Sequence, residues 1–191
     1  AAWQMAERGT RVRLFEMRPG ARSEAHQGDG RIWECDPTGD SPAVPRNALG
    51  VRTHGSVAVD PLGGHCYMTE AHRDGRLYRF RMLDESASGA ALADGLLEAM
   101  VVDPDGGVSW IPVPDPSGTV APTRIQAADG FVTPMGGGVW VHDGSLIFTT
   151  ALDDRVHAVD LLKLIMNKRI NRDLHWMEAV PISQAVTLPP L

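Results

Sequence analysis

A glutamate near the start of the sequence stands where nucleotide-binding units place an acidic residue. Residues 1–8 are good helix formers, Gly9 is a natural end for that helix, and residues 11–16 alternate like a strand ending on Glu16. In a dinucleotide-binding βαβ unit, an acidic residue at such a strand end binds a ribose hydroxyl. Glu16 is therefore the candidate cofactor-binding residue.

The phosphate-binding part of such a unit is missing from the sequence. The Gly-rich turn that lets a pyrophosphate approach a helix N-terminus would come before residue 1, as would the first strand. Because the pyrophosphate site carries the binding, we favour a solvated strand-end carboxylate as the role of Glu16. Residues 1–30 are predicted to be a truncated Rossmann-like head.

Other reactive residues form incomplete arrangements. His54 and Ser56 share a strand face by their spacing, but the sequence offers no third member of a catalytic triad. Cys35 and Cys66 match no zinc motif, and we expect two buried free thiols, with a disulfide as the alternative in an oxidising compartment. The sequence contains no P-loop, nucleophile elbow, HExxH or EF-hand pattern.

Composition indicates a turn-rich globular protein. The 191 residues carry a net charge of −6, which argues against a nucleic-acid-binding surface, because phosphate contacts need clustered Lys and Arg. The 20 glycines and 14 prolines favour β structure over a helical bundle. No apolar run approaches the ~20 residues of a membrane-spanning helix.

Residues 31–160 are predicted to form short antiparallel strands separated by turns rich in Asp, Pro and Gly. The expected strands are residues 30–35, 56–59, 65–69, 77–81, 98–102, 109–113, 138–142, 145–149 and 155–160. Residues 57–80 and 139–161 echo each other, because both read as strand, Asp-containing turn, strand ending in Thr, polar loop and strand. This repeat favours a β-propeller over a sandwich or barrel.

The predicted fold is therefore mainly β, with partial propeller-like sheets, a short helix-strand head and a C-terminal helix. A whole propeller needs ~4–8 blades, and this region is long enough for about two. Open sheet edges would invite self-association. In residues 161–191 we expect a helix over 161–172, capping the β region or binding a partner or membrane surface, and then a disordered tail.

The head resembles a known family. "AAWQMAERGTRVRLFEMRPG", followed by "EAHQGDG", is similar to the N-terminal region of TrmFO, a flavin- and folate-dependent tRNA uracil-5-methyltransferase. The resemblance implies that Glu16 contacts the ribose of FAD and that the protein is cytoplasmic. Since the glycine turn is missing, we do not expect FAD to be held by Glu16 alone.

The body resembles a second family. "IWECDPTG", "AVPRNALGVRTHGSVAVDP", "YMTEAHRDGRLYRF", "WIPVPDP", "PTRIQ" and "LIFTTALDDRVHAVDL" are similar to PhoX-type alkaline phosphatases. This resemblance implies a β-propeller with calcium and iron at the channel mouth, hydrolysis of phosphate esters and an extracytoplasmic location. The residues that it nominates are Glu34, Glu70, Asp153 and Asp154 as metal ligands, with His54 and Arg124 as catalytic contacts.

Two positions depart from the PhoX pattern. The family typically reads His-Glu where this chain has His54-Gly55, and Gly-Glu-Gly where it has residues 136–138, which are all glycine. Calcium needs about six to eight oxygen donors, and a glycine side chain offers none. We therefore expect the metal centre to be empty, and each remaining acid to be a turn cap or a solvated carboxylate.

Three functions follow from these patterns. The first is a degenerate PhoX-like segment that binds a partner or is inactive, with metal-dependent phosphoester hydrolysis as any residual activity. In that hydrolysis Arg124 would stabilise charge on the phosphate. The second is a fragment of a TrmFO-like methyltransferase, and the third is a structural module that assembles through open sheet edges.

Overall fold

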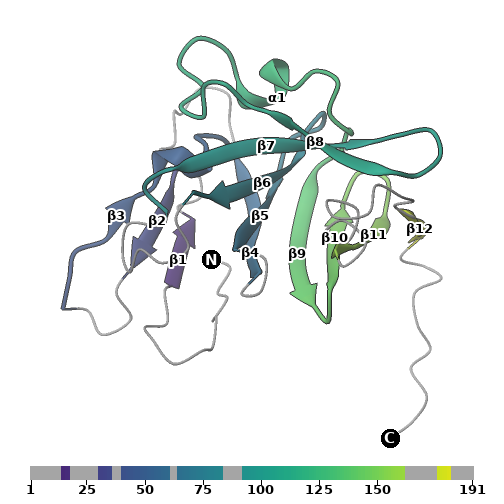
Figure 1. Ribbon diagram of the computed structural model, residues 1–191, viewed down its shortest axis with the longest axis horizontal. Helices are drawn as coiled ribbons and strands as arrows, with labels where there is room; N and C mark the ends of the chain where they lie inside the picture. The colour runs from purple at the N-terminus through teal and green to yellow at the C-terminus, as the bar shows by residue number, and fades with distance from the viewer. Residues whose placement is uncertain are drawn as a thin grey trace, which may run out of the picture.

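The described part of the chain is mainly antiparallel β structure. In the computed structural model it comprises residues 14–17, 30–35, 40–60, 64–83, 92–161 and 176–181. The strands make three sheets (Figure 1). The prediction of a mainly β fold is confirmed. Among these residues, no helix has the length and apolar composition needed to cross a membrane.

The largest sheet is a five-stranded meander in which each strand pairs with the next along the chain. Asp-rich turns and alternating burial produce this order, as at the hairpin where the Asp103 backbone N–H donates to the Gly107 carbonyl at 2.7 Å. The strands are β4 (His54–Asp60), β5 (His65–Glu70), β6 (Leu77–Met82), β7 (Gly95–Val102) and β8 (Val108–Pro112).

The second sheet is a four-stranded meander. Its strands are β9 (Gly136–His142), β10 (Ser145–Thr150), β11 (Arg155–Asp160) and β12 (Trp176–Pro181). Strand β12 lies where we expected a disordered tail, and it forms by pairing with β11. Of the helix expected over 161–172, only Leu161 is among the described residues.

The third sheet holds β1 (Leu14–Met17), β2 (Ile32–Cys35) and β3 (Val44–Pro45). Strand β1 is the strand expected in the head, but it pairs antiparallel with β2, so that Glu16 lies opposite Trp33. A βαβ unit would instead hold its strands parallel. The helix expected over residues 1–8 lies outside the described residues.

Two short helical turns complete the described elements, η1 (Asn47–Leu49) and α1 (Thr123–Gln126). Neither was expected from the sequence. Both cysteines are free thiols, with Cys66 buried and Cys35 half-buried.

The two meanders share one register. In the first sheet Met68 lies opposite Tyr78, and in the second Phe148 lies opposite His157 in the equivalent place. The first strand of each meander also carries an irregularity, between His54 and Ser56 in β4 and opposite the Phe148–Thr150 stretch in β9. The sequence repeat is therefore a repeat of structure.

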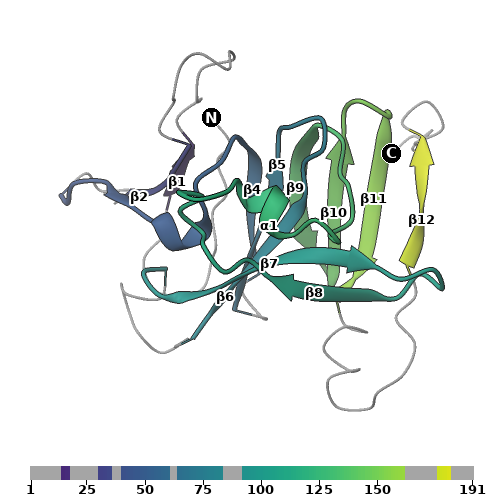
Figure 2. The same ribbon diagram turned by 90° about the horizontal axis from the view of Figure 1, so that it is seen from above.

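The sheets enclose two apolar cores. One lies between the two meanders, which stand side by side in Figure 2. Its principal residues are Ala58, Tyr67, Leu77, Met100 and Val108 of the first sheet and Val139, Leu146, Phe148 and Val159 of the second. The other core lies on the far side of the first sheet, where Ile32 and Leu49 pack against residues such as Met68, Tyr78 and Phe80.

Glycine permits the close approach of β4 and β9, which are in contact. A Cβ atom added at Gly55 would lie 2.1 Å from the carbonyl oxygen of Gly136, and one added at Gly136 would lie 2.9 Å from that of Glu70. Nearby, the Thr69 hydroxyl donates to the carbonyl of Gly137 at 2.5 Å. These contacts leave no room for a side chain at position 55.

We expect Gly55→Ala to lower the free energy of unfolding by about 1–3 kcal/mol, because the methyl group forces β4 and β9 apart. Gly138→Ala is the matched control, since its Cβ would come no closer than 3.8 Å to the Thr149 hydroxyl. That variant should stay within about 0.5 kcal/mol of the parent. Urea unfolding measures both, and equal effects would contradict the close approach.

Candidate functional site

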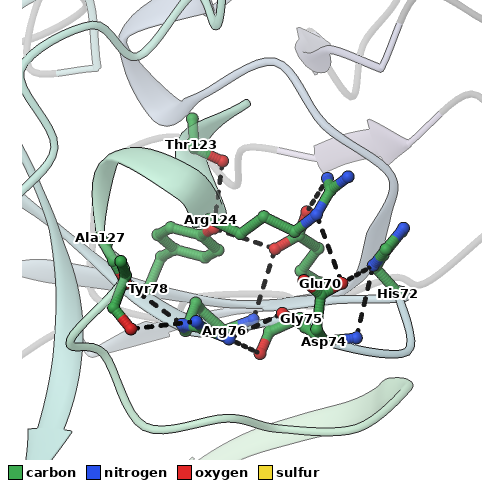
Figure 3. A network of polar contacts seen from close by, with 10 residues as sticks. Glu70, His72, Asp74, Gly75, Arg76, Tyr78, Thr123, Arg124 and Ala127 are labelled. Carbon is green, nitrogen blue, oxygen red and sulfur yellow. Dashed lines mark hydrogen bonds and ion pairs between the residues drawn. The ribbon is translucent and has the colours of Figure 1, made fainter. Parts of the chain in front are cut away.

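The carboxylate of Glu70, the last residue of β5, is the centre of a buried polar cluster (Figure 3). Its side chain is 1% exposed. Oε2 accepts hydrogen bonds from the Tyr78 hydroxyl at 2.9 Å and from the Arg76 backbone N–H at 3.3 Å. Oε1 accepts one from Arg124 Nη1 at 3.2 Å. Both oxygens are therefore occupied by donors of the chain itself.

Arg124 joins this buried carboxylate to the surface. It lies on α1, and its Nε is 3.4 Å from Oδ1 of Asp74, a residue of the turn between β5 and β6. The same Asp74 oxygen contacts Nδ1 of His72. The guanidinium group thus bridges two carboxylates, one buried and one half-exposed.

Tyr78 brings a second cation into the cluster. Its hydroxyl lies 3.0 Å from Oγ1 of Thr123, and its ring is covered by the Arg52 guanidinium at 3.8 Å from the centroid. Burial raises the pKa of Tyr78, although the charge of Arg52 opposes that shift. The hydroxyl therefore stays protonated and acts as a donor to Glu70.

Arg76 is a structural clamp between the β5–β6 turn and the end of α1. It is 6% exposed and donates from Nε to the carbonyl of Ala127 at 3.2 Å and from Nη2 to that of Ala128 at 3.3 Å. Its Nη1 donates to the carbonyls of Asp74 at 2.7 Å and Gly75 at 3.1 Å. The buried guanidinium is fully committed to holding loops in place.

His54 begins β4 and lies opposite Glu70 in the strand register. Its Nε2 is 3.0 Å from the carbonyl of Gly50. Burial, and to a lesser extent the nearby charge of Arg52, lowers the pKa of His54 well below its usual range. Hydrogen bonding to the backbone carbonyls of Gly50 and Gly30 opposes this shift. The ring is therefore neutral at pH 7.

The other nominated acids belong to other parts of the sequence than this cluster and contact other residues. On β2, Oε2 of Glu34 accepts from both Nε and Nη2 of Arg46, each at 2.7 Å. In the exposed turn between β10 and β11, Oδ2 of Asp153 lies 3.7 Å from Nε of Arg155, and Asp154 has a φ of 52°. The side chain of Glu16 is outside what the structure describes.

The described residues fit a metal ion poorly. They contain no group of three or more His, Cys, Asp and Glu side chains that could hold one. Calcium would need several free oxygen donors, but both oxygens of Glu70 are already engaged, and Glu34 is paired with Arg46. Position 55 has no space for the glutamate that the PhoX pattern would place there.

A family model described as "Alkaline phosphatase PhoX" matches residues 4–160. The chain belongs to the PhoX alkaline phosphatase family. The match takes in the strands of the first sheet, those of the second as far as β11, and the Glu70 cluster. It also runs across residue 30, where we expected the head to end. The resemblance of residues 1–30 to TrmFO stays a prediction.

No curated protein matches this PhoX chain. One similar solved structure, titled "Crystal structure of Nidogen/Laminin Complex", is 14% identical with a TM-score of 0.33. That similarity covers 89% of this chain and 59% of the other. A TM-score so low carries no structural argument.

The structure brings together some of the nominated PhoX residues and adds others. Glu70 and Arg124 form an ion pair, and His54 is the register partner of Glu70. The partners that the sequence did not single out are Arg46, Arg52, Arg76, Tyr78 and Thr123. Arginine is mostly exposed in proteins and tyrosine is intermediate in burial, so the sequence alone does not mark these residues as buried partners.

We expect Glu70→Gln to lower the free energy of unfolding by about 2–4 kcal/mol, because it leaves Arg124 and Arg52 without the buried negative charge. Asp74→Asn is the control, since its side chain is 49% exposed and its ion pair with Arg124 should contribute under about 1 kcal/mol. Thermal and urea unfolding measure both variants. A Glu70→Gln variant with an unchanged free energy of unfolding would show that the cluster does not stabilise the fold.

The lowered pKa of His54 predicts acid sensitivity. The unfolded chain takes up a proton near pH 6.5 and the folded chain does not, so stability is full above that pH and falls below it, by up to ~1.4 kcal/mol per pH unit. His157, whose pKa burial also lowers, adds to this effect.

His54→Asn should therefore reduce the loss of stability between about pH 7 and pH 5, measured by urea unfolding. His142→Asn, at the exposed end of β9, should leave the loss unchanged. The same pH profile in both variants would contradict the role of His54.

Proposed function

We propose that this chain is a PhoX-like segment that binds or assembles and does not itself hydrolyse phosphate esters. One observation carries the proposal. The two nominated acids that lie in sheets, Glu34 and Glu70, are each ion-paired with an arginine, Arg46 and Arg124. The two pairs join residues 12 and 54 positions apart in the sequence, and each holds separate elements of the fold together.

Arginine pairing opposes metal binding for an electrostatic reason. A divalent cation at Glu70 would have to displace Arg124 or accept its positive charge as a close neighbour, and the energy of such a contact is large where water is excluded. The same holds at Glu34 beside Arg46. Neither carboxylate is a free ligand of the kind that calcium or iron takes.

The nominated catalytic contacts are also committed elsewhere. Arg124 is neutralised by Glu70 and Asp74, so that little of its charge remains for a phosphate oxyanion. His54 is held against the carbonyl of Gly50 by its Nε2. These contacts favour a structural role for the cluster, which is to position β4, β5 and α1.

The proposal predicts no phosphatase activity from the purified chain. With calcium and iron added, hydrolysis of p-nitrophenyl phosphate should stay at the rate of a heat-denatured sample, and elemental analysis should find no stoichiometric metal. Arg124→Gln, which frees one oxygen of Glu70, should not create activity, because too few other donors lie nearby. Metal-dependent turnover lost in Glu70→Gln would overturn the proposal.

A flavin spectrum tests the alternative of a TrmFO-like fragment. We expect no flavin absorbance in the purified protein, because the strand that carries Glu16 pairs antiparallel with β2, whereas a nucleotide-binding βαβ unit holds its strands parallel. Bound flavin would make that alternative the better account of residues 1–30.

A further inference from the structure

A buried histidine lies among aromatic rings in the second meander. His157 of β11 is 2% exposed, and its ring stacks on that of Phe148 with the centroids 4.6 Å and the planes 10° apart. Phe131 meets the same ring edge-on at 6.0 Å. Nε2 of His157 lies 2.9 Å from Oγ1 of Thr150, which is itself fully buried. Aromatic rings and a hydroxyl therefore hold this imidazole.

The first meander contains the equivalent contact. By the register that the two meanders share, Tyr78 corresponds to His157 and Glu70 to Thr150. The Tyr78 hydroxyl donates to Glu70 at 2.9 Å, as the imidazole pairs with Thr150. Each meander thus joins the end of its second strand to its third strand through one buried side-chain hydrogen bond.

The two contacts differ in how they respond to acid. In the first meander Tyr78 stays protonated and Glu70 is ion-paired with Arg124. In the second meander the partner of the hydroxyl is a histidine, the side chain that gains its charge closest to neutral pH. We propose that His157 is an acid-sensitive switch, whose protonation opens β10 and β11 locally before the fold as a whole is lost.

The charged groups near His157 do little to stabilise an imidazolium there. Asp153 favours protonation and Arg155 opposes it, and these two lie 3.7 Å from each other in the turn and at the start of β11. Tyr67, the titratable member of the apolar core between the meanders, stays neutral because burial raises its pKa. Burial is the largest influence on His157 and lowers its pKa.

The sign of the effect follows from this burial. A histidine in an open, solvated strand takes up a proton near pH 6.5, whereas the closed, buried one does so only at lower pH. Lowering the pH from about 7.5 to about 5.0 therefore raises the ratio of open to closed molecules, by up to ~30-fold. Well above pH 6.5 the ring is neutral and the contact with Thr150 is intact.

Hydrogen–deuterium exchange of the full chain at these two pH values, corrected for the intrinsic effect of pH on exchange, measures the opening. In the parent chain, amide protection over residues 145–160 should fall ~10–30-fold in acid. His157→Gln carries an amide that can pair with Thr150 but takes up no proton, so it should limit that fall to under ~3-fold. His157→Tyr, which copies the first meander, should do the same. Because the fall is a ratio within each protein, a less stable variant still tests the proposal.

His54→Gln is the matched control, because it removes the other histidine whose pKa burial lowers. In that variant, protection should still fall over residues 145–160 and should hold over residues 65–82 of β5 and β6. A fall in His157→Gln as large as in the parent, or equal falls in both ranges of His54→Gln, would overturn the proposal. Metal binding and catalysis are measured separately, so such a result would leave the proposed function as it stands.

Discussion

Four segments of the chain meet at the carboxylate of Glu70. Through it β5 is tied to Tyr78 on β6, to the turn at Arg76 and to Arg124 on α1, which follows 54 residues later. A buried carboxylate is costly unless donors surround it, so this one charge fixes where the other segments must lie. The arrangement of the loops around the first sheet depends on it.

The same end of the sheet is where the two meanders come together. Thr69, one residue before Glu70, donates to the carbonyl of Gly137, and Gly55 and Gly136 let the strand backbones approach. Glycine here serves packing between sheets. The departure from the PhoX pattern at position 55 therefore has a structural consequence, because the space that a glutamate would take is filled by the backbone of β9.

Much of the fold could be predicted because its information is local. Alternating strands and Asp-Gly turns gave β4 to β11 nearly in place, and the echo between residues 57–80 and 139–161 became a shared register. Strands β3 and β12 were not predicted. Each forms by pairing with a neighbouring strand, and the local sequence pattern does not show that pairing. The resemblance nominated Glu70 and Arg124, but not the tyrosine and arginines that engage them, because such contacts join distant parts of the chain.

On the function proposed above, arginine and not a metal ion neutralises Glu34 and Glu70, the two nominated acids that lie in sheets. Thermal unfolding with added calcium, and again after chelation with EDTA, is the test, because a ligand that binds only the folded state raises its melting temperature. We expect the same melting temperature in both conditions. A rise with calcium that EDTA reverses, and that Glu70→Gln or Glu34→Gln abolishes, would contradict it.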